Sequence, residues 1–394
     1  MTNVQRMSEL DILRGFAVAV MILVVSPGSW GHTYAPLRHA DWHGWTFADL
    51  VFPDFLFGVG MALGLTFGRS LDPNEQTAFW TKVGRRVIGL TLLGLALNYL
   101  AVISGLLGAP PVGPQDYTTW RIPGVLQRIA AAYLIAVFIM WLSSVVAHRE
   151  APRPVQIGIA IAVLLIGYWV ALSFVPVPGY GVGQLDMEGN LAAYIDRAVF
   201  GTQHMWPLAA ESWRGPVLYD PEGILATFPA SANILFGVLA VSIWTKLGDR
   251  CIPALLVAGG LLIAAALLLE PLFPINKKIW TSTFALLTSG ISFVALAAVA
   301  TLLRAGMLPL LAPFRVLGGN AILAFSISIF LSAIAGIPLA SVEDPPTLQS
   351  TGFRIMSAVV PDPHLASLAC AFGIVLLIFL MIFPLHRRGI HIRL

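Results

Sequence analysis

Long apolar stretches constrain the fold of this chain more than any other feature of its sequence. Ten of them are long enough to cross the ~30 Å hydrocarbon core of a bilayer as helices. Backbone groups in lipid must be hydrogen-bonded within their own segment, so a helix is expected at each one. The segments lie at about 10–26, 46–67, 84–104, 123–143, 155–175, 223–245, 252–270, 282–303, 317–338 and 365–384. We therefore predict an all-α, polytopic integral membrane bundle with about ten transmembrane helices.

The composition agrees with this class and excludes others. Hydrophobic residues make up 57% of the 394-residue chain and charged residues only 11%, as in membrane proteins. No basic run is longer than two residues, so nucleic acid is not expected as a partner. Neither an internal repeat nor a long polar stretch is visible, and residues 1–394 are predicted to form a single transmembrane domain.

The distribution of basic residues predicts the orientation. With an even number of spans both termini share one side, and most Lys and Arg residues fall in the loops of that side. The positive-inside rule then places both termini in the cytoplasm. The first apolar segment lacks a small-residue cleavage pattern and is interpreted as a retained span. Cys251 and Cys370 would lie near opposite faces, so no disulfide is expected.

The connector at about 176–222 is a long outer, or periplasmic, loop that is rich in Trp, Gly and Pro. Long structured loops are often lids or binding loops. Two tryptophans would suit stacking on a sugar, and two polar neighbours would supply hydrogen bonds: Trp206, Trp213, His204 and Glu211. Anchoring at the membrane interface explains the tryptophans equally well.

The first outer loop carries His39, Asp41 and His43 at alternate positions. A histidine exchanges a proton near neutral pH, and a carboxylate would orient it as a general base or nucleophile. A metal site is a second interpretation, although this spacing is a weak signal for one. Capping or solvation at the start of the next helix is a third. The spacing leaves these readings open, and we predict no metal.

The helix that follows contains two carboxylates, Asp49 and Asp54, where a lipid-facing sequence would have none. At about 100° per residue they point roughly 140° apart, so they do not form a pair. Asp49 would lie near the interface, where solvation alone would explain it. Asp54 lies deeper and must be paired, protonated or next to water. An arginine from a neighbouring helix is its expected partner.

Gln127 and Arg128 lie one to two turns inside the fourth apolar segment. Because arginine stays charged in essentially all environments, Arg128 needs a carboxylate, a carbonyl or an anionic ligand beside it. An ion pair with Asp49 or Asp54 and direct binding of a ligand are both consistent with its position. Either arrangement would place Arg128 at the outer end of a polar cavity.

Charged residues also mark the predicted cytoplasmic end. Asp11 and Arg14 share a helix face, so a local salt bridge is the simplest explanation for them. Together with Arg85 and Arg86 they would otherwise form a mouth that meets an anionic cofactor. Retention of basic residues on the cytoplasmic side explains Arg85 and Arg86 as well.

Three further motifs precede apolar segments: YDPEG, with Asp220 and Glu222, NKKIW at 276–280, and GGN at 318–320. A proline and an acidic first turn are ordinary features of a helix start. Structure alone therefore explains these motifs.

Several of these segments, in this order, resemble a single family. The chain resembles the heparan-α-glucosaminide N-acetyltransferase family of transmembrane acyltransferases in MSELDILRGFAV, RHADWHGWTFADLVFPDFLFGVG, RIPGVLQRIAAAY, LYDPEGILATFPA, NKKIWTSTFAL and GGNAILAF. The resemblance covers essentially the whole chain, which looks like a compact bacterial member.

The resemblance implies a function. Members take acetyl groups from cytoplasmic acetyl-CoA and place them on an amino sugar across the membrane, here the bacterial inner membrane. The catalytic histidine of the family lies in an HxxWxG motif, which falls on His39, with Trp42 and Gly44 completing it. The family also has a functional asparagine at the outer end of the preceding helix, where this chain has Val25 followed by Ser26.

Roles beyond that of His39 are hypotheses from the residues and their predicted positions. Catalysis would rest on His39, with Asp41 or Asp49 orienting the ring and Ser26 among the donors to a developing oxyanion. The residues expected to bind the amino sugar or glycan acceptor are Trp42, Asp54, Gln127, Arg128, Asp220 and Glu222. Those expected near acetyl-CoA are Asp11, Arg14, Arg85 and Arg86. Membrane lipid surrounds such a chain, and a homodimer is consistent with the family.

Two other functions fit the sequence less well. A transporter for a sugar or its derivative would use intramembrane charges such as Asp54 and Arg128. However, the sequence shows neither paired interrupted helices nor an internal repeat, which mark transporter sites. An O-acyltransferase of the same fold would use the same histidine chemistry on a hydroxyl group.

Overall fold

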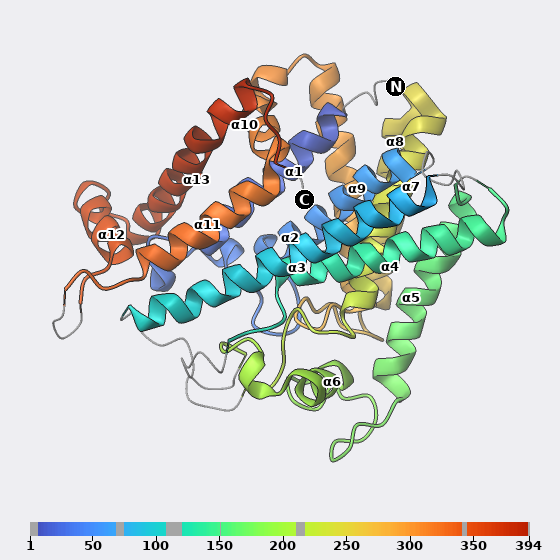
Figure 1. The fold of residues 1–394 in the computed structure, drawn as a ribbon, viewed down its shortest axis with the longest axis horizontal. Coiled ribbons are helices and arrows are strands. Elements are labelled where there is room, and N and C mark those ends of the chain that lie inside the picture. The colour runs from blue at the N-terminus through green and yellow to red at the C-terminus, as the bar shows by residue number, and fades with distance from the viewer. Residues whose placement is uncertain are drawn as a thin grey trace.

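The computed structural model describes residues 7–67, 75–107, 120–149, 151–209, 217–340 and 345–392. Regular structure in these ranges is helical (Figure 1), with isolated β-bridges and no strand among them. The all-α prediction is therefore confirmed. The α-helices are α1 (Ser8–Val25), α2 (Val51–Thr66), α3 (Gln76–Leu106), α4 (Val125–Val146), α5 (Pro154–Phe174), α6 (Leu191–Phe200), α7 (Thr227–Leu247), α8 (Cys251–Leu269), α9 (Ser282–Arg304), α10 (Leu308–Gly319), α11 (Ala321–Ala335), α12 (Leu348–Val359) and α13 (Pro363–Arg387).

Every predicted apolar segment coincides with a helix, but the number of ten spans is not confirmed. Within the described ranges, seven helical runs are long and apolar enough to cross a membrane, or eight if the bent pair α10–α11 is one span. Two features account for the difference. Helix α1 contains Glu9, Asp11 and Arg14, and α7 and α8 form one 43-residue run, Thr227–Leu269.

Helix α2 lies at the centre of the bundle. Of its most apolar window 72% is buried, compared with 22% for α3 and 17% for α13, which present apolar side chains outward. The backbones of α2 and α7 approach closely: a Cβ on Gly60 would lie 1.8 Å from the Ile234 carbonyl oxygen, and one on Gly237 2.1 Å from that of Phe57. Small residues permit this kind of contact in membrane bundles.

One predicted span is broken. The apolar segment at 317–338 begins inside α10, and the chain bends by 77° at Asn320 before it continues as α11. The Asn320 side chain donates to the Ile390 carbonyl at 3.2 Å and accepts from the Ile392 N–H at 2.8 Å. The bend is therefore held by contacts with the end of the chain, and it is not the pair of interrupted helices typical of transporters.

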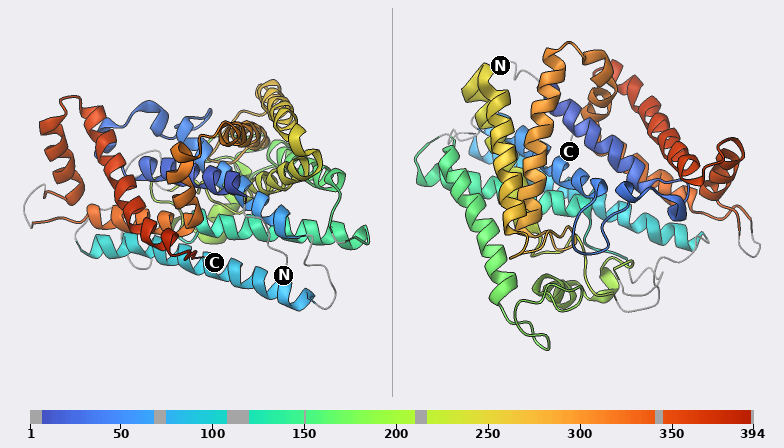
Figure 2. Two further views of the ribbon diagram at one scale, coloured as in Figure 1. Left: turned by 90° about the horizontal axis from the view of Figure 1, so that it is seen from above. Right: turned by 180° about the vertical axis from the view of Figure 1, so that it is seen from behind.

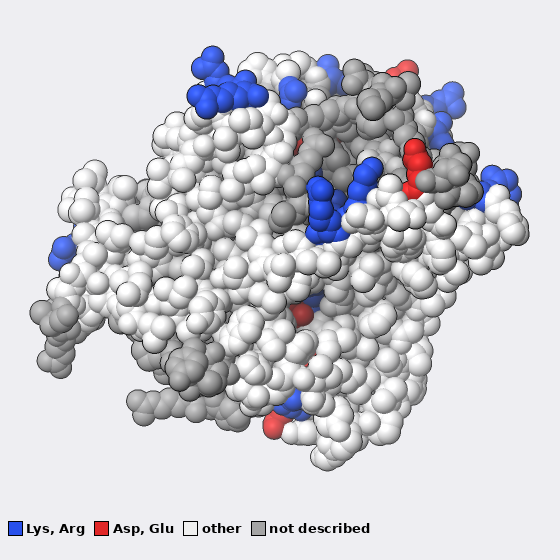
Figure 3. Space-filling view, in the orientation of Figure 1, with Lys and Arg blue, Asp and Glu red and all other residues white. Residues whose placement is uncertain are grey.

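Two short helices lie in connectors. Helix α6 occupies the long loop at 176–222, where Asn190 caps it by accepting a hydrogen bond from the Ala193 N–H at 2.8 Å. Helix α12 lies between α11 and α13. In Figure 1, α6 and the surrounding loops lie below α3 and α4, and Figure 2 shows α8 and α9 side by side. Many Lys and Arg side chains gather at the opposite, upper edge in Figure 3, above a broad uncharged band.

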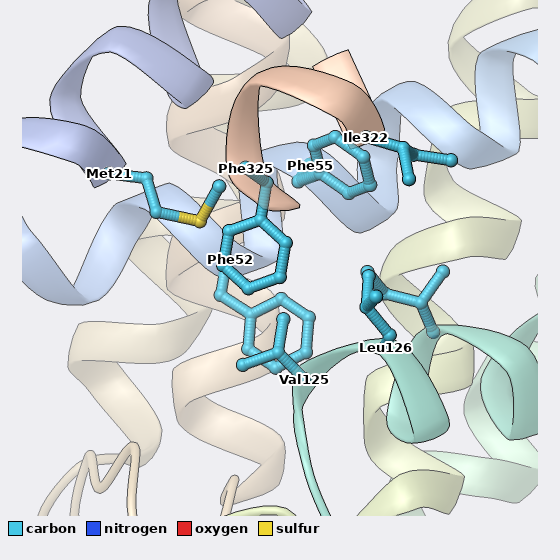
Figure 4. Close-up of a pocket in the computed structure, with 8 residues that line it drawn as sticks. Met21, Phe52, Phe55, Val125, Leu126, Ile322 and Phe325 are labelled. Carbon is cyan, nitrogen blue, oxygen red and sulfur yellow. The ribbon is translucent and has the colours of Figure 1, made fainter. Parts of the chain in front are cut away.

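Helices α1, α2, α4 and α11 meet at an apolar seam (Figure 4). Its side chains turn toward one another and leave a gap of about 10 Å³, which is close to the minimum for one water. The lining residues are Met21, Phe52, Phe55, Val125, Leu126, Ile129, Ile322 and Phe325. Phe52 also contacts the buried Trp280 ring edge-on, with centroids 5.2 Å apart. The seam therefore supports the segment just before α9 from the interior.

Candidate active site

The loop that carries His39 is fastened to a distant part of the chain. Gly44 has a φ of 91°, which glycine adopts without steric cost, and its N–H donates to the Ile275 carbonyl at 2.7 Å. Gly44 and Asn276 form an isolated parallel bridge, and Asn276 Nδ2 lies 3.3 Å from His43 Nδ1. We call this junction of residues 39–44 with residues 275–278 the outer platform.

Asp49 orients the imidazole of His39. The two side chains meet at 2.7 Å between His39 Nδ1 and Asp49 Oδ1. The His39 side chain is 35% exposed, whereas that of Asp49 is fully buried. An accepting carboxylate favours the tautomer with its proton on Nδ1, which leaves the lone pair on Nε2, where Lys277 Nζ lies 3.2 Å away. Asp41, the other sequence candidate for this role, is exposed.

The backbone in turn fixes Asp49. Its Oδ2 accepts from the Ala40 N–H at 3.1 Å, the Thr46 N–H at 2.9 Å and the Thr46 hydroxyl at 3.2 Å. Thr46 and Asp49 form a capping box at the 3-10 turn Phe47–Leu50 that precedes α2. The carboxylate of Asp49 therefore both caps the turn before α2 and orients the ring of His39. The interpretation of Asp49 as a solvated interfacial residue is wrong, because the loop folds over it.

Lys277 completes the arrangement and was not among the residues singled out from the sequence. Its Nζ lies 2.9 Å from His39 Nδ1, 3.2 Å from His39 Nε2 and 3.3 Å from Asp49 Oδ1. The NKKIW motif has an ordinary explanation as a helix start. The available signal was that its two lysines stand in a predicted outer loop, where the positive-inside rule disfavours them.

Burial and charge set the protonation of these groups. Burial lowers the pKa of His39, and the adjacent Lys277 lowers it further, against the opposing effect of Asp49. Burial also lowers the pKa of Lys277, and burial together with Lys277 brings the pKa of Lys278 to about 8. An imidazole with a lowered pKa is neutral at neutral pH, the form that accepts a proton or attacks a carbonyl.

A second charged cluster joins the connector before α4 to the connector before α7. Arg121 donates to Asp220 from Nε at 2.9 Å and from Nη2 at 2.5 Å, and also to Glu222. Although burial opposes both charges, the ion pairs raise the pKa of Arg121 and lower that of Glu222. Glu222 also interacts electrostatically with Lys277. Glu222 thus connects this cluster to the His39 site through Lys277. Arg121, which holds Asp220 and Glu222 together, is a residue that the sequence left unassigned.

Arg128 is buried with few partners. Its Nη2 donates to the Gly223 carbonyl at 3.1 Å, and its guanidinium carbon lies 5.1 Å from the centroid of the Trp280 ring. Nε and Nη1 have no hydrogen-bond partner among the described residues. The predicted ion pair with Asp49 or Asp54 is therefore wrong, because the immediate contacts of Arg128 are a carbonyl and an aromatic face.

Gln127 lies beside Arg128 and shapes the turn into α4. Its Nε2 donates to the Ile122 carbonyl at 3.0 Å, while Asn98 of α3 donates to the carbonyls of Arg121 and Pro123 at 2.9 and 2.7 Å. Gln127 Oε1 is buried without a hydrogen-bond partner in the described part of the chain. The Gln127 amide nitrogen is thus bound to the backbone, while its oxygen can accept a hydrogen bond from a ligand.

Trp42 links the outer platform to the long loop at 176–222. Its Nε1 donates to the Leu185 carbonyl at 2.8 Å, and its ring packs edge-on against Tyr219 with centroids 4.9 Å apart. Trp206 of that long loop is flanked by two cations from other segments. The guanidinium carbon of Arg121 lies 5.8 Å from the centroid of its ring, and the Nζ of Lys278 lies 5.0 Å from it.

Of the other loop residues singled out for a sugar, His204 is engaged by the backbone: its Nδ1 lies 2.9 Å from the Trp120 carbonyl oxygen. Glu211 and Trp213 lie outside the described residues.

Two predicted residues lie in other surroundings. The hydroxyl of Ser26 is 3.2 Å from that of Ser332 on α11, and no hydrogen bond between Ser26 and His39 exists in the described ranges. Asp54 lines a cavity of about 200 Å³ together with Ser292 of α9. No arginine of the described chain lines this cavity, so the predicted arginine partner of Asp54 is wrong, whereas a position next to space for water agrees with the sequence.

The residues expected near acetyl-CoA contact different helices. Asp11 of α1 is buried and Arg85 of α3 is exposed. The guanidinium of Arg14 lies 5.8 Å from the Phe55 ring of α2, and that of Arg86 lies 4.6 Å from the Tyr133 ring of α4. Arg14 and Arg86 therefore pack at two separate helix contacts, α1–α2 and α3–α4.

Comparisons with known proteins agree with one another. Residues 6–182 match a family model described as heparan-alpha-glucosaminide N-acetyltransferase, catalytic. The chain is 28% identical over 361 residues to heparan-alpha-glucosaminide N-acetyltransferase of Homo sapiens, covering 81% of this chain and 52% of that protein. It is also 28% identical over 339 residues to the Mus musculus protein of the same name, covering 75% of this chain and 49% of that protein. The chain spans about half the length of the curated relatives it matches.

The range matched by the family model includes the loop between α1 and α2 and the start of α4, with His39, Asp49 and Arg128. The two pairwise matches cover most of the chain. The resemblance seen in the sequence motifs is thereby confirmed: the chain is similar to curated heparan-α-glucosaminide N-acetyltransferases over most of its length.

Proposed function

We propose that the protein is a transmembrane acetyltransferase that moves an acetyl group from cytoplasmic acetyl-CoA to an amino sugar or glycan at the periplasmic face of a bacterial inner membrane. The observation that carries the proposal is the contact of His39 with Asp49 at 2.7 Å and with Lys277 at 2.9 Å. Acyl transfer to an amine requires a neutral, accessible and oriented base. His39 combines these properties in a chain related to N-acetyltransferases.

In the proposed reaction the amine nitrogen of the acceptor attacks the thioester carbonyl. The N–C bond forms and the C–S bond breaks. His39 Nε2 takes a proton from the amine and passes it to the departing sulfur, so that CoA leaves as a thiol. Asp49 stabilises the imidazolium that exists between the two proton transfers.

Lys277 supplies the third element of this mechanism. Its ammonium lies 3.2 Å from His39 Nε2, so it can donate to a carbonyl oxygen held at the ring. A preorganised donor stabilises the negative charge that develops on this oxygen. Transfer through an acetyl group carried on Nε2 would use the same three residues, and mass spectrometry of rapidly quenched enzyme separates the two routes.

The test is release of CoA by the purified protein with acetyl-CoA and glucosamine. We expect glucosamine-dependent release that falls about 10²–10⁴-fold in His39→Ala, the usual contribution of general acid–base catalysis. Asp41→Asn is the matched control from the same loop and should retain activity. Full turnover by His39→Ala contradicts the proposal. A transporter would bind the sugar without cleaving the thioester.

A further inference from the structure

A cavity beside Arg128 is not explained by the chemistry at His39. It has a volume of about 370 Å³ and lies between α3, α4, α6 and the start of α7. Its polar end is formed by Gln127, Arg128 and Glu222. The remaining walls are mostly apolar and include Leu95, Ala131, Ile135, Phe200, Ile224 and Phe228. The cavity is therefore amphipathic along its length.

The polar end offers unsatisfied hydrogen-bonding groups. Arg128 is only 1% exposed, yet its Nε and Nη1 have no partner in the described ranges, and neither does Gln127 Oε1. Buried polar groups without partners are costly. A ligand that presents an acceptor or an anionic group to Arg128 and an N–H or O–H donor to Gln127 removes this cost.

The apolar end faces the lipid side of the bundle. Phe228 is 40% exposed and Ile224 and Ala131 are exposed as well, although all three line the cavity. Helices α3 and α4 cross the middle of Figure 1, and the same view in Figure 3 shows a broad uncharged band there. A hollow in this band has acidic and basic atoms at its bottom. The cavity thus joins a buried polar end to a membrane-facing wall.

We propose that this cavity binds the acceptor as a membrane amphiphile, namely an amino sugar carried on a hydrocarbon chain. The chain lies along Leu95, Ala131 and Phe228, and the polar linkage reaches Arg128. This inference rests on the proposed acetyltransferase function and adds the class of acceptor. A free sugar would engage only the polar end and would leave the apolar, membrane-facing wall without a contact from the acceptor.

The polar end of the cavity is adjacent to the outer platform. Arg128 contacts Trp280, which follows Lys277 in the same short turn: the Trp280 N–H donates to the Lys277 carbonyl at 3.0 Å. Glu222 interacts electrostatically with Lys277. An amino group attached to a head at Arg128 is thereby directed toward the side of the molecule where Lys277 meets His39.

The test compares alkyl glucosaminides of increasing chain length in lipid nanodiscs. We expect kcat/KM for octyl glucosaminide to exceed that for methyl glucosaminide at least tenfold. Ala131→Trp fills the apolar end and should reduce this ratio toward the value that partitioning into lipid alone produces. Leu134→Trp is the control on the same helix, because Leu134 is exposed outside the cavity, and it should keep the wild-type ratio.

A second pair of variants guards against misfolding. Leu95→Trp closes the same end from α3, and Leu92→Trp, one turn away and outside the cavity, is its control. An equal chain-length ratio in wild type, Ala131→Trp and Leu95→Trp overturns the inference while leaving the acetyltransferase intact.

Absence of turnover with every acceptor would instead contradict the proposed function. Binding of tritiated octyl glucosaminide then decides the inference by itself. Binding that is weakened at least tenfold by Ala131→Trp and by Arg128→Gln supports it, and binding unchanged by both overturns it.

Discussion

His39 is set between two neighbours with opposite effects on its protonation. Asp49 accepts from Nδ1 and favours the imidazolium, whereas Lys277, at 2.9 Å, disfavours it. Burial acts in the same direction as Lys277, so the neutral ring prevails. Asp49 therefore holds the proton of the imidazole on Nδ1 while the ring as a whole stays neutral. A general base requires this combination.

Removal of the cation should change the pH dependence of catalysis. Lys277 lowers the pKa of His39, so Lys277→Met raises this pKa. Because the neutral ring is the active form, the acidic limb of the kcat/KM profile should then move to higher pH. Lys277→Arg keeps the cation and should leave the limb near its wild-type position. A limb that stays in place in Lys277→Met would show that the lysine does not tune the histidine.

Removal of the orienting carboxylate should be severe. Asp49→Asn keeps the shape of the side chain but no longer favours the proton on Nδ1, a change that costs about 10⁴-fold in the serine protease triad. We expect kcat to fall about 10²–10⁴-fold at optimal pH. Thermal unfolding of the variant should be measured in parallel, because Asp49 also caps the turn before α2. Wild-type kcat in a folded Asp49→Asn variant would exclude the orienting role.

The sequence indicates some of these residues because they share one motif. His39 and Asp49 are ten positions apart, so a local reading of the loop and the next helix finds both. Lys277 lies 238 positions from His39 and Arg121 lies 99 from Asp220. No local pattern relates such pairs, and the expected partners of Arg128 and Asp54 were wrong for the same reason.

Helices are the elements that the sequence predicts best. An apolar stretch in lipid has to satisfy its backbone internally, so its length alone specifies a helix. The elements that the sequence prediction missed are α6, α12 and the bend at Asn320. Helices α6 and α12 are only 10 and 12 residues long, too short to span a membrane, so the search for spanning segments does not find them. The bend interrupts an apolar stretch. The Asn320 amide bonds to the backbone 70 and 72 positions further on, which composition does not encode.

Close packing between elements makes Gly60 sensitive to a single methyl group. In Gly60→Ala the new Cβ would lie 1.8 Å from the Ile234 carbonyl oxygen, so α7 has to move away from α2. We expect destabilisation of about 1–3 kcal/mol or more, as for other overpacked sites. The measurement is the midpoint of thermal unfolding in one detergent.

Gly84→Ala on α3 is the matched control, because a Cβ there meets nothing within 4 Å. It should be neutral or stabilising by up to about 1 kcal/mol, the difference in helix propensity. Equal midpoints for the two variants would mean that the α2–α7 contact has room to adjust.

On the scale of the whole molecule, the proposed reaction connects two aqueous compartments. In sealed vesicles, acetyl-CoA is supplied on one side and labelled glucosamine on the other. We expect acetylated product on the side opposite to acetyl-CoA, because the donor is proposed to enter at the basic end and react at the outer platform. Product confined to the side of acetyl-CoA would contradict this arrangement. The same experiment tests the orientation and the localisation, which remain predictions from the loop charges.

The outer platform also has a consequence for biosynthesis. The bond from Gly44 to Ile275 and the contact of His39 with Lys277 join chain segments made far apart in time. At ~5–20 residues per second, the 238 residues between His39 and Lys277 take roughly 10–50 s to synthesise. During that interval His39 lacks both the burial and the neighbouring Lys277 that lower its pKa in the assembled site. The insertion of α8 and α9 is therefore the step at which an inert membrane chain gains its assembled site.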